Sequence, residues 1–308
     1  MKKFILKLIL SLLLFIVGSN IFAQQEALTT QYMFNGLSIN PAMAGSDNNL
    51  SVTGLIRSQW VGIDGAPNTQ VFSIHSPMRS NNYALGLNVT HDKIAVTGRT
   101  NISPSYAYRL HFSNGAILSL GIQASIINYK AGLTSLSPKE TSDVAFTGDI
   151  NTWMLNFGFG AYYYTNKYYI GISAPMLLNN NYSASGDKIS DAKLKRHYYL
   201  NAGYVFDLDK NYHLKPSVLL RYVENSYFTT DFNLNLYYKR YFGVGISYRT
   251  NESISALFEL FINDDLMIGY AYDYILSDIH MATSGSHEIM VNYLFPHNHK
   301  RVVTPRYF

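Results

Sequence analysis

The chain contains no cysteine among its 308 residues. A cysteine-free protein has no disulfide, no thiol nucleophile and no thiolate metal site. Charged residues make up only 14% of the chain, whereas soluble proteins average roughly 25%. Beyond the N-terminus there is no long hydrophobic run of the kind that marks a membrane-spanning helix. The formal net charge is +4 and the lysines and arginines are scattered, so the sequence predicts no nucleic-acid partner.

Residues 1–23 have the pattern of a secretory signal peptide. Three lysines lie within the first seven residues, an apolar stretch covers residues 8–17, and Ala23 is a small residue before the expected cleavage point. The alternative is a membrane anchor, but the apolar stretch is short for the roughly 20 residues that a spanning helix needs. Export of a chain without disulfides favours the Gram-negative envelope over a small secreted scaffold.

About fourteen short segments between Leu50 and Phe295 alternate apolar and polar residues. Successive side chains of a strand point to opposite faces, so each segment is a two-sided ribbon. One face of such a ribbon carries Leu118, Leu120, Ile122, Ala124 and Ile126, and the other carries Ser119, Gly121, Gln123 and Ser125. Glycines on the polar faces, such as Gly243, Gly245 and Gly269, are expected to serve curvature or close packing.

Alternation by itself fits either a soluble β-sandwich or a closed barrel in a membrane. The connections favour the barrel, because short ones tend to alternate with longer ones such as 58–69, 91–99, 129–151 and 174–196. Bacterial outer-membrane barrels have short periplasmic turns and longer outer loops. We therefore predict an all-β fold, a transmembrane antiparallel β-barrel of about 14 strands. Residues 50–308 form this barrel with a C-terminal tail, and residues 24–49 form a periplasmic segment or a plug.

Several motifs are spread over nearly all of the chain that follows the signal peptide. They are Gln31-Tyr32-Met33-Phe34-Asn35, Asn40-Pro41-Ala42-Met43-Ala44-Gly45-Ser46, the block from Arg57 and Gln59-Trp60 through Gly62, Gly65 and Pro67 to Gln70, Ser73-x-His75-x-Pro77, Tyr106-Ala107-Tyr108-Arg109 and Ser286-His287-Glu288-Ile289-Met290. Together these motifs resemble those of the PorP/SprF family of the type IX secretion system. Ser286 stands where the family pattern leads us to expect threonine.

The resemblance implies a bacterial outer-membrane barrel of the type IX secretion and gliding machinery. Such a protein would bind a partner polypeptide and assist its export or surface attachment. Its implied partners are type IX secretion components, a secreted adhesin or its C-terminal domain, and outer-membrane lipid. The alternative function is a passive outer-membrane diffusion channel, which needs an open polar lumen. Neither function requires a cofactor.

Nine histidines raise the question of metal binding or catalysis. His297 and His299 have no nearby acidic partner, and a zinc site needs three or four ligands, so we predict no metal site. His75 shares a strand face with Ser73, but a hydrolase would also need an orienting group within hydrogen-bond reach. We therefore expect no catalytic residues and no enzyme activity.

Residues 57–70 are the main candidate site. Trp60 is an amphipathic side chain of the kind that dominates interfaces, and Arg57 can make bidentate contacts with a carboxylate. Two interpretations remain open: a loop that folds into the lumen or binds a partner, or a barrel closure in which Arg57 pairs with Asp64 or Glu288. The hypothetical partner-binding or lumen residues are Arg57, Gln59, Trp60, Gly65, Pro67, Gln70 and His75.

Overall fold

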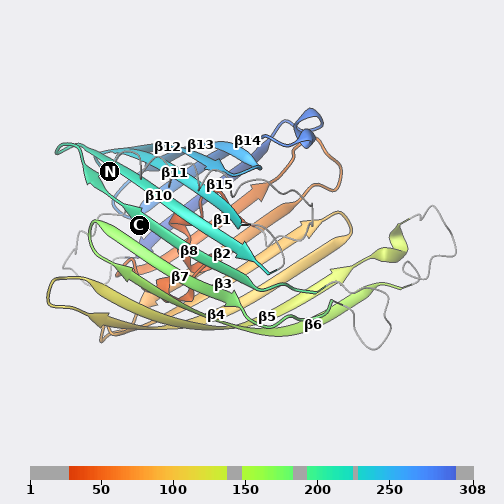
Figure 1. The fold of residues 1–308 in the computed structure, drawn as a ribbon, viewed down its shortest axis with the longest axis horizontal. Helices are drawn as coiled ribbons and strands as arrows, with labels where there is room; N and C mark the ends of the chain where they lie inside the picture. Colours follow the sequence, from red (N-terminus) through yellow and green to blue (C-terminus); the bar gives the residue numbers. More distant parts are fainter. Residues whose placement is uncertain (1–27, 137–147, 183–192, 225–227, 296–308) are drawn as a thin grey trace, which may run out of the picture.

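The computed structural model of the protein describes residues 28–136, 148–182, 193–224 and 228–295. The predicted signal peptide and the predicted C-terminal tail after Phe295 lie outside the described residues. The described chain forms one closed antiparallel β-barrel (Figure 1), as the alternating pattern predicts. No helix within these residues is both long and apolar enough to span a membrane.

Long tilted strands make up the barrel wall. They are β1 (Leu50–Ser58), β2 (Asn68–Pro77), β3 (Tyr83–Ile94), β4 (Thr97–His111), β5 (Ile117–Ala131), β6 (Ile150–Tyr164), β7 (Tyr168–Met176), β8 (His197–Tyr204), β9 (Phe206–Asp207), β10 (Tyr212–Val223), β11 (Phe228–Tyr238), β12 (Phe242–Arg249), β13 (Ser253–Phe261), β14 (Leu266–Ile275) and β15 (Ser286–Phe295). The short β9 continues β8 beyond Val205, and both pair with β10, so 14 strands surround the lumen.

The barrel closes where β1 pairs with β15. Leu50 lies opposite Phe295 at one end of this seam, and Arg57 lies opposite Glu288 near the other. Closure leaves the sheet without an unpaired edge, which is what a β-structure needs in lipid, where no water can satisfy backbone polar groups.

The apolar faces of the strands point out of the barrel. On β5, Ile122 is 62% exposed, whereas Ser119 and Ser125 on the opposite face are buried. The inward face of β15 is only partly polar, because Met290 and Leu294 point into the lumen beside Glu288 and Asn292. The outer surface is therefore an apolar band, which confirms the predicted membrane orientation of the wall.

Aromatic side chains border this band. Near the end of the barrel where β1 begins, ring contacts join Tyr163 to Tyr168 and Tyr168 to Tyr204. Towards the opposite end, Tyr222 contacts both Tyr198 and Phe228. Tyr212 and Tyr222 lie ten residues apart on β10, which for a strand tilted by roughly 40° gives a height of about 25 Å. These are the position and spacing of the interfacial aromatic girdles of membrane barrels.

The connections differ in length between the two ends of the barrel. The end that holds Leu50 and Phe295 has the connections 78–82, 112–116, 165–167, 208–211, 239–241 and 262–265. The opposite end has 59–67, 95–96, 132–149, 177–196, 224–227, 250–252 and 276–285. By the usual asymmetry of such barrels, the first end is periplasmic and the second extracellular.

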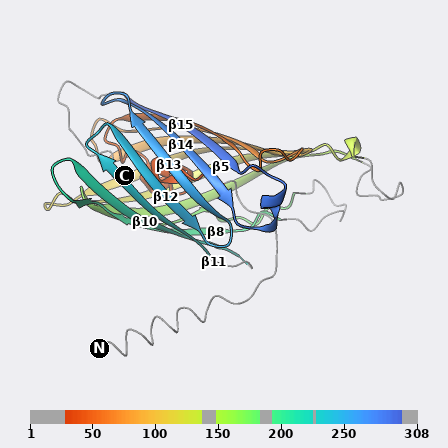
Figure 2. The same ribbon diagram turned by 90° about the horizontal axis from the view of Figure 1, so that it is seen from above.

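One predicted loop is wrong. Residues 91–99 were expected to form a long outer connection, but β3 and β4 stay paired up to Ile94 and Thr97. Only 95–96 form the turn, with Ala95 in the left-handed region at φ 49°. The residues at this end of the hairpin are polar, so the sequence pattern does not distinguish a continued strand pair from a loop. The hairpin of β5 and β6 also extends past the barrel body and carries η5 (Leu133–Ser135), as Figure 2 shows.

Charge placed on the outer wall should destabilise this protein only within the apolar band. We predict that Ile122→Lys lowers the free energy of unfolding from lipid vesicles by about 2–4 kcal/mol, because the ammonium group would face hydrocarbon. Val61→Lys, in the extracellular connection 59–67, should change it by less than about 1 kcal/mol. Equal effects of the two substitutions in denaturant titrations would contradict the assigned membrane band.

Candidate functional site

The lumen is filled by the segment that precedes β1. This plug, residues 28–49, contains three short 3-10 helices, η2 (Tyr32–Phe34), η3 (Gly36–Ser38) and η4 (Pro41–Met43). It runs along the inside of the barrel (Figure 1). Its contacts with wall residues show that it begins near the extracellular end, at Thr30, and reaches the periplasmic end at Asn48. The two motifs at 31–35 and 40–46 that carry the family resemblance both belong to the plug.

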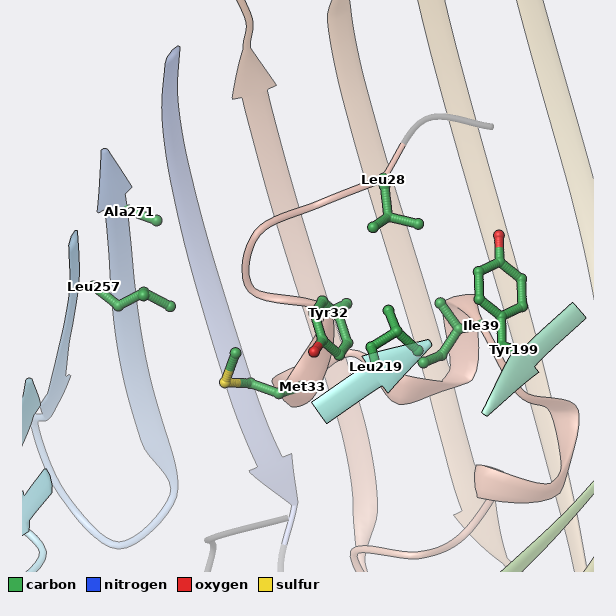
Figure 3. Close-up of a cluster of buried hydrophobic side chains, with 8 residues drawn as sticks. All are labelled: Leu28, Tyr32, Met33, Ile39, Tyr199, Leu219, Leu257 and Ala271. Carbon is green, nitrogen blue, oxygen red and sulfur yellow. The ribbon is translucent and has the colours of Figure 1, made fainter. Parts of the chain in front are cut away.

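Apolar side chains of the plug contact apolar patches of an otherwise polar wall. Figure 3 shows Leu28, Tyr32, Met33 and Ile39 of the plug grouped with four residues of β8, β10, β13 and β14. Phe34 packs against a second patch. The wall residues of these two patches are Tyr199, Leu219, Leu257 and Ala271, and then Leu55, Val71, Val205, Tyr237, Phe261, Met267 and Met290. Their burial explains why these inward positions break the polar pattern.

Inward-facing glycines make room for the plug. A Cβ on Gly121 would collide with the backbone of Ala42, and one on Gly160 would collide with the Asn40 side chain. A Cβ on Gly171 would collide with Asn201 of the wall and lie 3.1 Å from Asn40 Nδ2. The space is used for hydrogen bonds, because Asn40 Nδ2 donates to the carbonyl oxygens of Ala161 (3.1 Å) and Ile172 (3.4 Å). Side chains at these glycine positions would lift the plug off the wall.

The glycines that the sequence assigned to curvature or close packing also have close neighbours, on the plug or on the wall. A Cβ on Gly269 would meet the Gln31 amide, and one on Gly245 would meet Asn235. A Cβ on Gly243 would meet Glu259 and Tyr237. The lumen is therefore closely packed over each of these three glycines.

A buried charge cluster holds the extracellular tip of the plug. The Glu288 carboxylate accepts hydrogen bonds from two successive backbone N–H groups, those of Thr30 and Gln31, both at 2.8 Å. The Thr30 hydroxyl donates to Asp273 at 2.9 Å. Arg57 Nη1 lies 2.6 Å from Asp273 Oδ2 and 3.2 Å from Glu288 Oε2. We call Arg57, Asp273 and Glu288 the tip latch. Removal of one partner from such a buried network leaves an uncompensated charge, which costs about 3–5 kcal/mol.

The rest of the plug is held by hydrogen bonds outside the latch, including one from Arg109 Nη2 to Asn48 Oδ1 at the periplasmic end. Ser73 donates to Asn35 Oδ1 at 2.6 Å, and Ser173 donates to the carbonyl of Ile39 at 2.7 Å. At the periplasmic end, the backbone N–H of Gly45 donates to His75 Nδ1 at 3.1 Å. The plug is thus anchored along its whole described length. The buried carboxylates of the latch contact only the tip of the plug.

The structure places five predicted site residues in or beside the extracellular connection 59–67. Arg57 points into the lumen and pairs with Glu288, one of its two predicted partners; its other carboxylate partner is Asp273, not Asp64. Gln59 N–H donates to the carbonyl of Pro67, which closes the loop at 2.9 Å. Trp60 is half-buried and has a left-handed backbone (φ 49°). Its backbone N–H donates to Ser286 Oγ at 3.2 Å.

This connection belongs to a rim of three extracellular connections. Gly65, at φ 74°, accepts a hydrogen bond from Ala95 N–H through its carbonyl. Val61 exchanges backbone hydrogen bonds with Ser284 and Gly285 of the connection 276–285, which contains η7 (Asp278–Met281). The rim therefore consists of 59–67, 95–96 and 276–285. Exposed apolar side chains lie on it, among them Val61 and Met281, the latter 79% exposed.

The remaining two predicted residues lie apart from the rim. Gln70 is exposed on the outer face of β2, so it is not a lumen residue. His75 faces the plug at the periplasmic end, with Nε2 3.6 Å from Asp47 Oδ2. The predicted set is therefore divided between rim, lumen and outer wall, because a strand carries alternate residues to opposite faces.

Exposed polar contacts close connections at each barrel end. The side chain and N–H of Thr134 donate to Asp149 Oδ1, and these hydrogen bonds lower the pKa of that carboxyl. In the periplasmic turn 165–167, a hydrogen bond to Asp207 raises the pKa of Lys167. Both contacts are solvent-exposed and contribute little to stability, so they shape turns and do not define the site.

Sequence reasoning missed Thr30, Asn40 and Asp273. Asp273 was visible as a charged residue on an inward strand face, but its partner is more than 200 residues away in the chain. The inward glycines at 121, 160 and 171 were the available signal for the plug, since they mark where the wall lacks side chains.

Together, the closed wall, the outer apolar band and the girdles define a transmembrane β-barrel of the outer-membrane type whose lumen holds its own N-terminal segment. The sequence profile described as Type IX secretion system membrane protein PorP/SprF matches residues 21–293. The chain therefore belongs to the PorP/SprF family and is a protein of the bacterial outer membrane.

Several solved outer-membrane proteins are similar to the chain at low identity. The CymD monoaromatic hydrocarbon channel is 14% identical, with a TM-score of 0.48, over 90% of this chain and 96% of that one. Omp33 of Acinetobacter baumannii is 11% identical, with a TM-score of 0.45, over 80% and 98%. The KdgM porin is 11% identical, with a TM-score of 0.40, over 80% and 99%. No curated protein sequence matches the chain.

Two glycine substitutions test whether the plug is seated as described. Gly121→Ala should lower the free energy of unfolding by about 1–3 kcal/mol, because the new methyl group overlaps the backbone of Ala42. Gly54→Ala is the matched control, because a Cβ there meets nothing within 4 Å. Indistinguishable unfolding curves for the two variants would show that the plug does not lie on β5.

Proposed function

We propose that this protein binds a partner polypeptide at the cell surface and assists its export or attachment as an accessory of the type IX secretion system. Membership of the PorP/SprF family supports this setting. The proposed partners are other components of that system and a secreted adhesin or its C-terminal domain. The observation that carries the proposal is the plugged lumen, because a filled barrel is suited to holding a polypeptide and not to free passage of solutes.

The plug occupies the lumen through which a solute would have to diffuse. A cleft between the plug and the wall, lined by residues that include Leu28, Tyr32, Asn88, Gln123 and Tyr199, has a volume of about 40 Å³. A solute that crosses the barrel would have to pass or displace the plug.

The extracellular rim supplies a surface for a partner. Its three connections are fixed to one another by backbone hydrogen bonds, which limits the entropy lost on binding. Val61 and Met281 are exposed on it, and Trp60 is half-buried beside them. Apolar and aromatic groups on a rigid frame are the usual anchors of protein interfaces.

We propose no catalytic role. The Ser73 hydroxyl donates to Asn35, and His75 Nδ1 accepts from Gly45 N–H, so both groups are engaged with the plug. A Ser–His pair that acts in hydrolysis instead needs the histidine within hydrogen-bond reach of the serine.

Deletion of the gene in its host should remove one surface protein and leave general export intact. Complementation with Trp60→Ser should restore barrel levels in the outer membrane without restoring the surface protein, because the rim loses its aromatic group. Trp153→Ser, which changes an outer-wall tryptophan that is 67% exposed, is the matched control and should restore both. Surface proteomics of the parent strain, the deletion strain and the two complemented strains measures this. An unchanged surface in the deletion strain would contradict the proposed function.

A passive diffusion channel is the second candidate, favoured by the polar side chains that line the lumen. The two functions differ in conductance. We expect the full-length protein to show no large steady current in planar lipid bilayers, because the plug occupies the lumen. Large steady currents from protein with an intact N-terminus would favour the channel.

A further inference from the structure

The tip latch recognises the plug through its backbone. Glu288 uses both carboxylate oxygens to accept the N–H groups of Thr30 and Gln31, and such charge-assisted hydrogen bonds are stronger than neutral ones. Because every residue except proline offers a backbone N–H, this part of the contact does not depend on the side chains at positions 30 and 31.

One plug side chain also joins the latch, because the Thr30 hydroxyl donates to Asp273 and accepts from Arg57 Nη1 at 2.8 Å. Other polar groups are less well matched. Gln31 is fully buried, yet neither polar atom of its side-chain amide has a hydrogen-bond partner among the described residues. Each unpaired buried polar group opposes the seated state. The tip is thus held in part by a backbone contact that another chain could also make.

The latch lies beside the extracellular mouth. Glu288 is two residues from Ser286, whose hydroxyl accepts the N–H of Trp60 in the rim. The cleft next to the tip is lined by Thr29 and Tyr32 of the plug and by Asn88 and Asn101 of the wall. The cleft therefore presents amide side chains of the wall beside the residue that precedes Thr30.

We propose that the tip latch is a docking site for an extended polypeptide, in which two successive backbone N–H groups of the partner replace those of Thr30 and Gln31 on Glu288. The plug tip is the occupant within the same chain, and the partner displaces it from the extracellular side. This inference rests on the proposed function and gives the partner's contact in chemical terms: an extended segment with two free N–H groups and no proline at those positions.

The cysteine-free chain allows a direct test on the full-length protein in lipid nanodiscs. Thr29→Cys places a thiol on the buried tip, and Ala44→Cys places one on the buried periplasmic part of the plug. The probe is a synthetic peptide with the sequence of residues 28–36. Its matched control carries N-methyl groups on the Thr30 and Gln31 nitrogens, which removes the two donors and leaves every side chain unchanged.

We expect the unmethylated peptide to raise the rate of thiol labelling at position 29 several-fold, with no change at position 44. The methylated peptide should have no effect. Glu288→Gln should raise labelling at position 29 by about tenfold without peptide, because the carboxylate acceptor is lost.

Equal effects of the two peptides would overturn the proposal, since recognition would not use the N–H pair. No effect of the unmethylated peptide would also overturn it, whatever Glu288→Gln does. Either result leaves the proposed function standing, because that function is tested independently by the surface proteome of the deletion strain.

Discussion

Closure of the sheet between β1 and β15 is the constraint on which the rest of the structure depends. The register of this seam sets Arg57 opposite Glu288 and so forms the charged pair at the extracellular end of the lumen. A lipid environment requires the closure, because an open sheet edge would leave backbone groups unsatisfied in hydrocarbon. The same seam thus seals the wall and forms the site that holds the plug.

Plug and wall are complementary in two different ways. Near the middle of the plug, missing side chains on the wall at Gly160 and Gly171 let Asn40 reach backbone carbonyls. At the tip, buried charges bind the plug backbone through Glu288. The first contact depends on shape and is specific to this segment. The second combines a carboxylate that accepts two backbone N–H groups with the Thr30 hydroxyl, and only the backbone part is independent of the side chains of the plug.

Sequence reasoning reached the fold through the two-residue period of strands. Ile122 outside and Ser119 inside follow directly from that period, and the resemblance at 31–35 and 40–46 identified the family. It failed at 91–99, because polar residues continue a strand pair beyond the membrane band as readily as they form a loop. It also grouped Gln70 with Arg57, although the barrel wall separates them, since a segment that leaves one strand and enters the next presents both faces.

The sequence by itself determined the all-β fold, the orientation of its apolar faces and the family, because these depend on local alternation and on short motifs. Only the tertiary structure decided that residues 28–49 run inside the barrel and that Asp273 and Glu288 meet at Thr30. Those contacts join residues more than 240 positions apart, and no local pattern records which distant side chains a closed barrel brings to the same depth of its lumen.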